Sequence, residues 1–92
     1  MTARHVYFSG RVQGVGFRYS AKQIASGFDV TGWVKNLPDG RVELFAQASE
    51  ADEVEAFLED IERSSLGSHI KEREVRTVAA QGGLRGFGIV RE

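Results

Sequence analysis

The spacing of apolar residues changes period along the chain, and this alternation most restricts the folds that the sequence can adopt. In residues 4–12 the apolar side chains take alternate positions, as in a strand with one buried face. Strand composition returns in residues 30–36 and 41–48, around an LPDG sequence at 37–40 that is typical of a reverse turn. Between the first and second of these three strands, the spacing is that of a helix with one apolar face, formed by Phe17, Ala21, Ile24, Ala25 and Phe28.

The second half of the chain repeats the change from strand to helix to strand. Ser49 and Asp52 form a capping-box pattern, and the apolar helix face behind it contains Val54, Phe57, Leu58 and Ile61. Ile70–Val78 is predicted as a weaker strand and Leu84–Val90 as a short last one. The order β-α-β-β-α-β predicts an α+β, ferredoxin-like sandwich, with a four- or five-stranded antiparallel sheet and two helices on one face.

This topology predicts which distant residues meet. A right-handed β-α-β crossover makes the first two strands parallel, so their carboxyl ends share one edge of the sheet. The loop at 13–18 follows the first strand, and Asn36 ends the second. We therefore expect the loop and Asn36 to lie at one site.

The sequence GRVQGVGFR at 10–18 combines three glycines with an arginine at a strand-to-helix junction. If the helix begins near Phe17, the N–H groups of residues 14–18 lie at the positive end of its dipole, where anions bind. The guanidinium of Arg18 can bind two oxygens of one phosphate or carboxylate. The pattern predicts a cradle for a small anion. From spacing alone, turn glycines beside an exposed arginine remain the alternative, as does a plain turn role for Asn36.

Composition narrows the classes of protein further. The 92 residues suit one domain, 1–92, and the absence of cysteine excludes disulfides and thiolate zinc sites. The net charge of −1 divides into +4 for residues 1–41 and −5 for residues 42–92. We expect a cytoplasmic monomer that binds neither nucleic acid nor a membrane. The segment RGFGIV at 85–90 resembles the base-stacking segment of RNA-recognition domains, but it falls on the last predicted strand and lacks the required aromatic residues.

Two longer segments carry a family resemblance. GRVQGVGFR at 10–18 and GWVKNLPDGRVEL at 32–44 resemble the two signature regions of the acylphosphatase family, and the resemblance extends over essentially the whole chain. It departs from the family pattern at Leu44 and Ala48, where glycine is usual. These two departures raise a question about the local geometry of the third strand.

The resemblance implies an enzyme that hydrolyses the carboxyl–phosphate bond of small acyl phosphates to carboxylate and inorganic phosphate, with no metal and no cofactor. It implies that Arg18 and Asn36 are catalytic and that Asn36 positions the attacking water. The implied phosphate-binding residues are Gly14, Val15, Gly16, Phe17 and Arg18. Two alternatives are a small-anion-binding domain without catalysis, and an acylphosphatase-like module of a larger protein that acts on carbamoyl phosphate. The free-standing length of the chain, with no linker at either end, counts against the second alternative.

Overall fold

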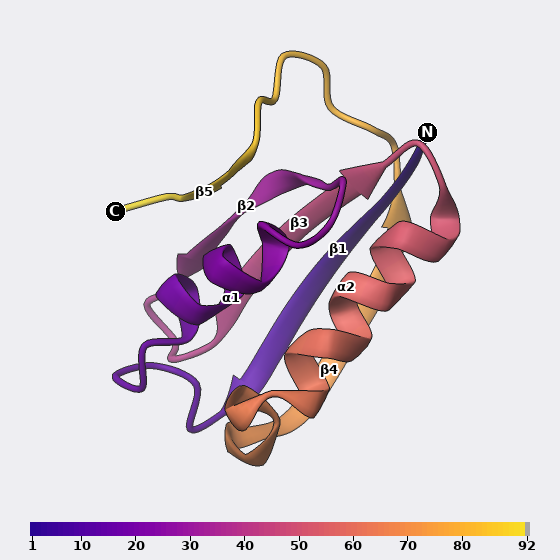
Figure 1. Cartoon of the computed structure of the whole chain (residues 1–92). Coiled ribbons are helices and arrows are strands. Elements are labelled where there is room, and N and C mark those ends of the chain that lie inside the picture. The colour runs from indigo at the N-terminus through magenta and orange to yellow at the C-terminus, as the bar shows by residue number, and fades with distance from the viewer. Residues whose placement is uncertain (92) are drawn as a thin grey trace.

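Five strands and two α-helices follow one another in the computed structural model, which describes residues 1–91 (Figure 1). In chain order they are β1 (Thr2–Gly10), α1 (Phe17–Ala25), β2 (Thr31–Asn36), β3 (Val42–Ala48), α2 (Ala51–Arg63), a 3-10 turn η1 (Ser65–His69), β4 (Ile70–Val78) and β5 (Phe87–Ile89). The predicted β-α-β-β-α-β order is confirmed, with β5 as an added strand. Within residues 1–91 no helix is long and apolar enough to cross a membrane.

The strands lie in the sheet order β4-β1-β3-β2-β5. β3 is antiparallel to both β1 and β2, so β1 and β2 run in the same direction and end at the same edge, as predicted. β5 pairs with β2 in parallel, which makes the sheet mixed rather than wholly antiparallel. The reason is the path of the chain: it leaves β4 at the end where β2 begins, and the following loop crosses that end to the outer side of β2 (Figure 1).

Two local predictions were wrong. The first strand ends at Gly10 rather than at residue 12. At Gly10 the pairing with β4 shifts and the backbone has φ 119°. An added Cβ there would lie 2.6 Å from the carbonyl oxygen of His69, so the close approach of the two backbone segments requires glycine. The capping box does not form either, because α2 has Glu50 at its N-cap and no side-chain capping bond.

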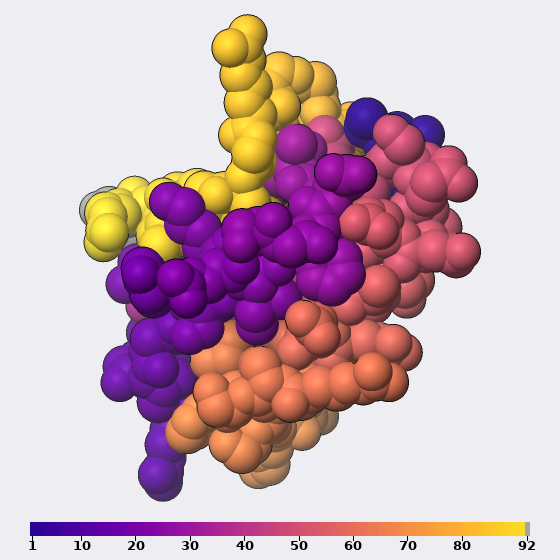
Figure 2. Space-filling model, viewed as in Figure 1, coloured from indigo at the N-terminus to yellow at the C-terminus, as the bar shows by residue number. Residues whose placement is uncertain are grey.

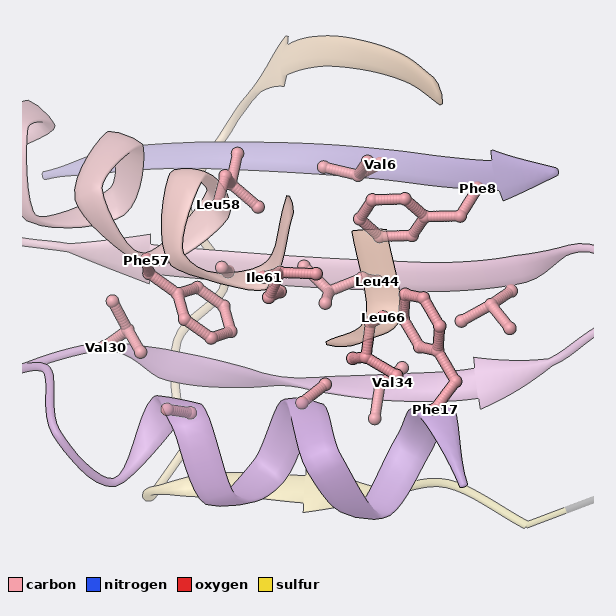
Figure 3. Packing of buried hydrophobic residues seen from close by; sticks show 14 of the residues in the cluster. Val6, Phe8, Phe17, Val30, Val34, Leu44, Phe57, Leu58, Ile61 and Leu66 are labelled. Atoms are coloured by element: carbon pink, nitrogen blue, oxygen red, sulfur yellow. The ribbon is translucent and has the colours of Figure 1, made fainter. Parts of the chain in front are cut away.

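The core lies between the sheet and the two helices, which cover one face. Figure 3 shows Val6 and Phe8 on β1, Val34 on β2 and Leu44 on β3 beside residues of both helices. Each fully buried apolar side chain of this size contributes about 1.5–3 kcal/mol. Leu44 is fully buried opposite Val6 and Val34, and β3 pairs without interruption from Val42 to Ala48. The departures from glycine at positions 44 and 48 therefore leave the strand regular.

Phe17 connects the core to the loop that precedes it. Its ring is 2% exposed and lies 5.0 Å, centroid to centroid, from the ring of Phe8. The first residue of α1 is thus packed against the end of β1. Figure 2 shows the C-terminal segment, in yellow, lying against α1, which places residues near position 90 beside the same helix.

Candidate active site

The loop between β1 and α1 presents its backbone to solvent. Gly14 and Gly16 have φ values of 79° and 76°, in the left-handed region that glycine adopts without strain. Gly16 is the N-cap of α1 and makes no side-chain capping bond. The first helical bond runs from the Ser20 N–H to the Gly16 carbonyl (3.0 Å), so the amides of the first turn have no acceptor inside the helix. These donors, at the positive end of the helix dipole, suit an anion.

Arg18 and Asn36 line the same cavity, of about 210 Å³. Gly14, Gly16 and Phe17, three of the residues implied by the resemblance as phosphate-binding, line it too. Arg18 reaches it from the first turn of α1, and Asn36 from the last position of β2. Both side chains are half-buried. The predicted shared edge of β1 and β2 thus brings the two residues together.

Val15 lies differently from its neighbours. Its side chain packs against the hydrophobic core, so it does not line the cavity. Any contact of Val15 with a bound anion must therefore come from its backbone N–H. Phe17 lines the cavity, but its ring is buried against Phe8, so its hydrogen bond to a bound anion must also come from its backbone N–H.

Four further residues line the cavity that the sequence pattern did not predict: Val12, Tyr19, Ile89 and Arg91. Arg91 brings a second guanidinium. It is placed there because β5 pairs with β2 and the Val90 N–H donates to the Val34 carbonyl (2.9 Å). The available signal was the predicted last strand, but its partner strand was not identified.

The described lining of the cavity is positively charged. Among residues 1–91 it holds the guanidinium groups of Arg18 and Arg91 and no carboxylate. None of the ion pairs found within residues 1–91 involves either arginine. No group of three or more His, Asp or Glu side chains in that same part of the chain is arranged to hold a metal ion. Two cations with helix-terminal amides and an amide side chain form a donor set for a phosphate.

Comparison with known proteins identifies the family of the chain. The acylphosphatase family model matches residues 4–89. An acylphosphatase of Methylococcus capsulatus is 43% identical over 88 residues, which cover 96% of this chain and 95% of the relative. An acylphosphatase of Trichormus variabilis is 42% identical over 87 residues, 95% of this chain and 84% of the relative.

Solved structures give the same result. The acylphosphatase from Bacillus subtilis superimposes with a TM-score of 0.87 at 36% identity, covering 98% of this chain and 99% of that one. HypF from T. kodakarensis superimposes with a TM-score of 0.83 at 33% identity, over all of this chain but only 12% of the HypF chain. The same fold therefore also occurs within a much longer protein. The family model and the full-length relatives together show that this chain belongs to the acylphosphatase family.

Proposed function

We propose that this acylphosphatase hydrolyses small acyl phosphates in the cavity between the β1–α1 loop and the end of β2, without a metal ion. In this proposal the amides of residues 14–18 and the guanidinium of Arg18 bind the phosphoryl oxygens, and Asn36 holds the attacking water. The observation that carries the proposal is that Arg18 and Asn36, from separate elements, line one positively charged cavity.

The reaction needs little more than these groups. The water oxygen bonds to phosphorus as the bond between phosphorus and the acyl oxygen breaks, and the acyl group leaves as a carboxylate with the bonding electrons. The water's protons pass to a phosphate oxygen or to solvent. Because a carboxylate is a stable leaving group at neutral pH, no general acid has to protonate it. What remains is positioning and charge compensation, which dominate phosphoryl transfer.

The division of roles follows from the chemistry of the side chains. Arg18 carries a permanent charge and a fork of donors that fits two phosphoryl oxygens. The amide of Asn36 both donates and accepts hydrogen bonds, so it can orient a water molecule without acting as a strong base. Within residues 1–91 the lining has two guanidinium groups and no carboxylate, and this favours an anion over a hard metal cation, whose usual protein ligands include carboxylates.

The test is hydrolysis of acetyl phosphate, in the presence of excess chelator, by the wild type and the variants Arg18→Ala and Asn36→Ala. We expect full wild-type activity and a loss of about 10²-fold or more in each variant, as for removal of one transition-state contact. Phosphate affinity should fall in Arg18→Ala and persist in Asn36→Ala. Arg11→Ala is the matched control, because Arg11 lies exposed in the same loop and does not line the cavity.

The same assay separates the alternatives. An inactive wild type that still binds inorganic phosphate would support the anion-binding domain. Hydrolysis confined to carbamoyl phosphate would support the module interpretation. The observation that favours this interpretation is the match to 12% of the much longer HypF chain. Full activity of Arg18→Ala would contradict the site itself. The cytoplasmic location and the monomeric state stay predictions from the sequence.

A further inference from the structure

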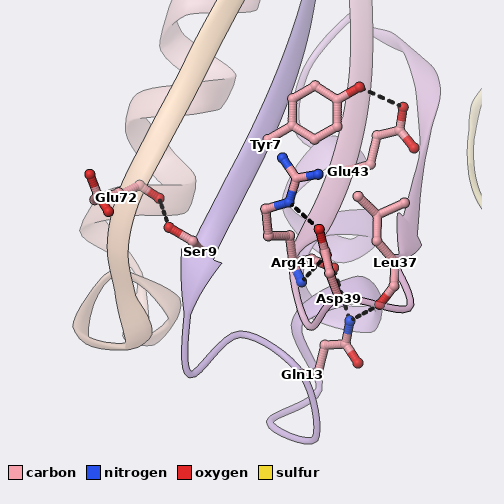
Figure 4. Close-up of polar contacts among 8 residues, drawn as sticks. All are labelled: Tyr7, Ser9, Gln13, Leu37, Asp39, Arg41, Glu43 and Glu72. Atoms are coloured by element: carbon pink, nitrogen blue, oxygen red, sulfur yellow. Dashed lines mark hydrogen bonds and ion pairs between the residues drawn. The ribbon is translucent and has the colours of Figure 1, made fainter.

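We propose that Gln13 is a positioning residue that sets Asn36 relative to the loop carrying Arg18. The side-chain amide nitrogen of Gln13 donates to the carbonyl oxygens of Leu37 (2.8 Å) and Arg41 (2.9 Å), as Figure 4 shows. Gln13 neither lines the cavity nor contacts Arg18 or Asn36 through these bonds. The proposal rests on the proposed function, because it concerns how the two halves of that site are held together.

The two acceptors enclose the hairpin turn between β2 and β3. Leu37 also donates its N–H to the Arg41 carbonyl (2.8 Å), and its own carbonyl accepts from the Gly40 N–H (3.1 Å). The Gln13 amide therefore binds the base of the turn on both sides. Removing this amide would remove both of these hydrogen bonds between the turn and the β1–α1 loop.

Each end of this link lies next to a functional residue. On the hairpin side, Leu37 directly follows Asn36, which is the last residue of β2 and pairs with Val42. On the loop side, Gln13 directly precedes Gly14, the first glycine of the cradle. A displacement of reacting groups by about 1 Å can cost 10²-fold in rate, so a bond that fixes the two backbones matters to the water that Asn36 holds.

The residue type fits this role. A primary amide offers two N–H donors on one uncharged nitrogen, which matches two carbonyl acceptors. Leucine has a similar volume and no donor. Gln13→Leu therefore removes the two bonds while keeping most of the packing.

The expected consequence is a separation of kcat from phosphate affinity. Phosphate is bound by Arg18 and by the loop amides, whereas the hairpin carries the water-positioning Asn36. We expect Gln13→Leu to lower kcat by about 10-fold or more, a fraction of the effect of full misplacement. The inhibition constant of inorganic phosphate should change less than about threefold, that is, by less than ~0.7 kcal/mol. A parallel loss of both would mean that Gln13 shapes the cradle instead, and would overturn the proposal.

A double variant tests whether Gln13 acts through Asn36. If it does, Gln13→Leu should cost no further activity in an Asn36→Ala background, because the group being positioned is already absent. Additive losses would show that the two residues act independently and would also overturn the proposal.

Gln47 provides a matched control for stability. Its side chain also makes two hydrogen bonds to backbone, both with Gln81 (2.8 and 2.7 Å), and it is 4% exposed. Those bonds lie far from the cavity, at the other end of β3. Gln47→Leu should lower the melting temperature and leave kcat unchanged below it. An equal fall of kcat in Gln47→Leu would assign the Gln13 effect to general destabilisation.

Backbone-amide hydrogen exchange gives a readout that does not depend on activity. In Gln13→Leu we expect faster exchange of the Leu37 N–H, with the pairs between β1 and β3 unchanged. Unchanged exchange at Leu37 would overturn the proposal even in an active enzyme. A wild type that fails to hydrolyse acyl phosphates would overturn the proposed function, while this measurement would still decide whether Gln13 holds the hairpin.

Discussion

Val90 donates its backbone N–H to the carbonyl oxygen of Val34 at 2.9 Å, and this bond joins the end of the described chain to the strand that carries Asn36. Arg91, the next residue, lines the same cavity as the glycine loop. One backbone bond thus places a second cation beside the proposed phosphate site.

We expect Arg91→Ala to raise the KM for acetyl phosphate about fivefold, the effect of ~1 kcal/mol, with little change in kcat. Arg91 is exposed, so salt should screen its attraction, and the difference should shrink in 0.5 M NaCl, where the Debye length is only about 4 Å. Steady-state kinetics at two ionic strengths would measure this. Arg85→Ala is the control, since Arg85 is exposed in the preceding loop and outside the cavity lining. A salt-independent effect would contradict a charge role.

Gly16→Ala should destabilise the protein by about 1–2 kcal/mol through backbone strain alone. The added Cβ would meet no atom within 4 Å, but the φ of 76° is unfavourable for any residue with a Cβ. Phosphate affinity should fall as well, because the amides of the first turn would be displaced. Urea unfolding and phosphate titration would test both effects.

Two further substitutions check the cause. Gly16→Asn should be milder than Gly16→Ala, because asparagine tolerates the left-handed region. Gly27→Ala should be nearly neutral, since its Cβ would lie at an ordinary 3.6 Å from the Ile24 carbonyl and its φ is not positive. Equal losses at positions 16 and 27 would contradict the strain argument.

Leu44→Ala should lower the free energy of unfolding by about 2–5 kcal/mol, the usual cost of emptying a buried leucine site. The side chain is fully buried between Val6 and Val34. The kcat of the folded protein should be retained, because the cavity lining does not include position 44. Val75→Ala, at a position 39% exposed on β4, should cost much less. A loss of kcat in folded Leu44→Ala would show that the strand geometry reaches the site.

Asp39 should make the hairpin turn sensitive to acid. The Arg41 backbone N–H (3.0 Å) and the Arg41 side-chain Nε (2.8 Å) donate to its carboxylate, and these bonds lower the pKa of Asp39, the backbone bond most strongly. A lowered folded-state pKa adds stability above the unfolded value of about 3.9, and that stability is lost as pH falls through the folded value. We expect Asp39→Asn to melt at a lower temperature than the wild type at pH 7, and the difference to shrink as the pH falls below about 3.9, the unfolded value. A difference independent of pH would contradict this assignment.

The spacing of apolar residues predicted the helices and strands well, because the apolar face that each spacing defines is buried in the core. β4 occupies Ile70–Val78 as predicted, and α1 begins at Phe17, whose ring packs on Phe8. The meeting of Arg18 and Asn36 followed from the handedness of one crossover, which needs no knowledge of side-chain contacts.

The remaining features depend on contacts that the local pattern does not encode. The prediction of a capping box was wrong because the N-cap of α2 is Glu50 and not Ser49. In the first turn of that helix, the carboxylate of Glu53 accepts a hydrogen bond from the distant Asp29 N–H (2.7 Å). The direction of β5, and with it Arg91, depends on where a loop crosses the sheet. The bonds of Gln13 join a side chain to carbonyls 24 and 28 residues away, and no period in the sequence marks such a pair.

The pairing of β5 with the outer side of β2 also has a consequence for synthesis of the chain. Until β5 has left the ribosome, that side of β2 is a free strand edge, which can pair with another nascent chain. At about 5–20 residues per second, the interval between residues 36 and 91 lasts several seconds. The short last strand therefore closes, late in translation, the edge at which newly made copies would otherwise aggregate.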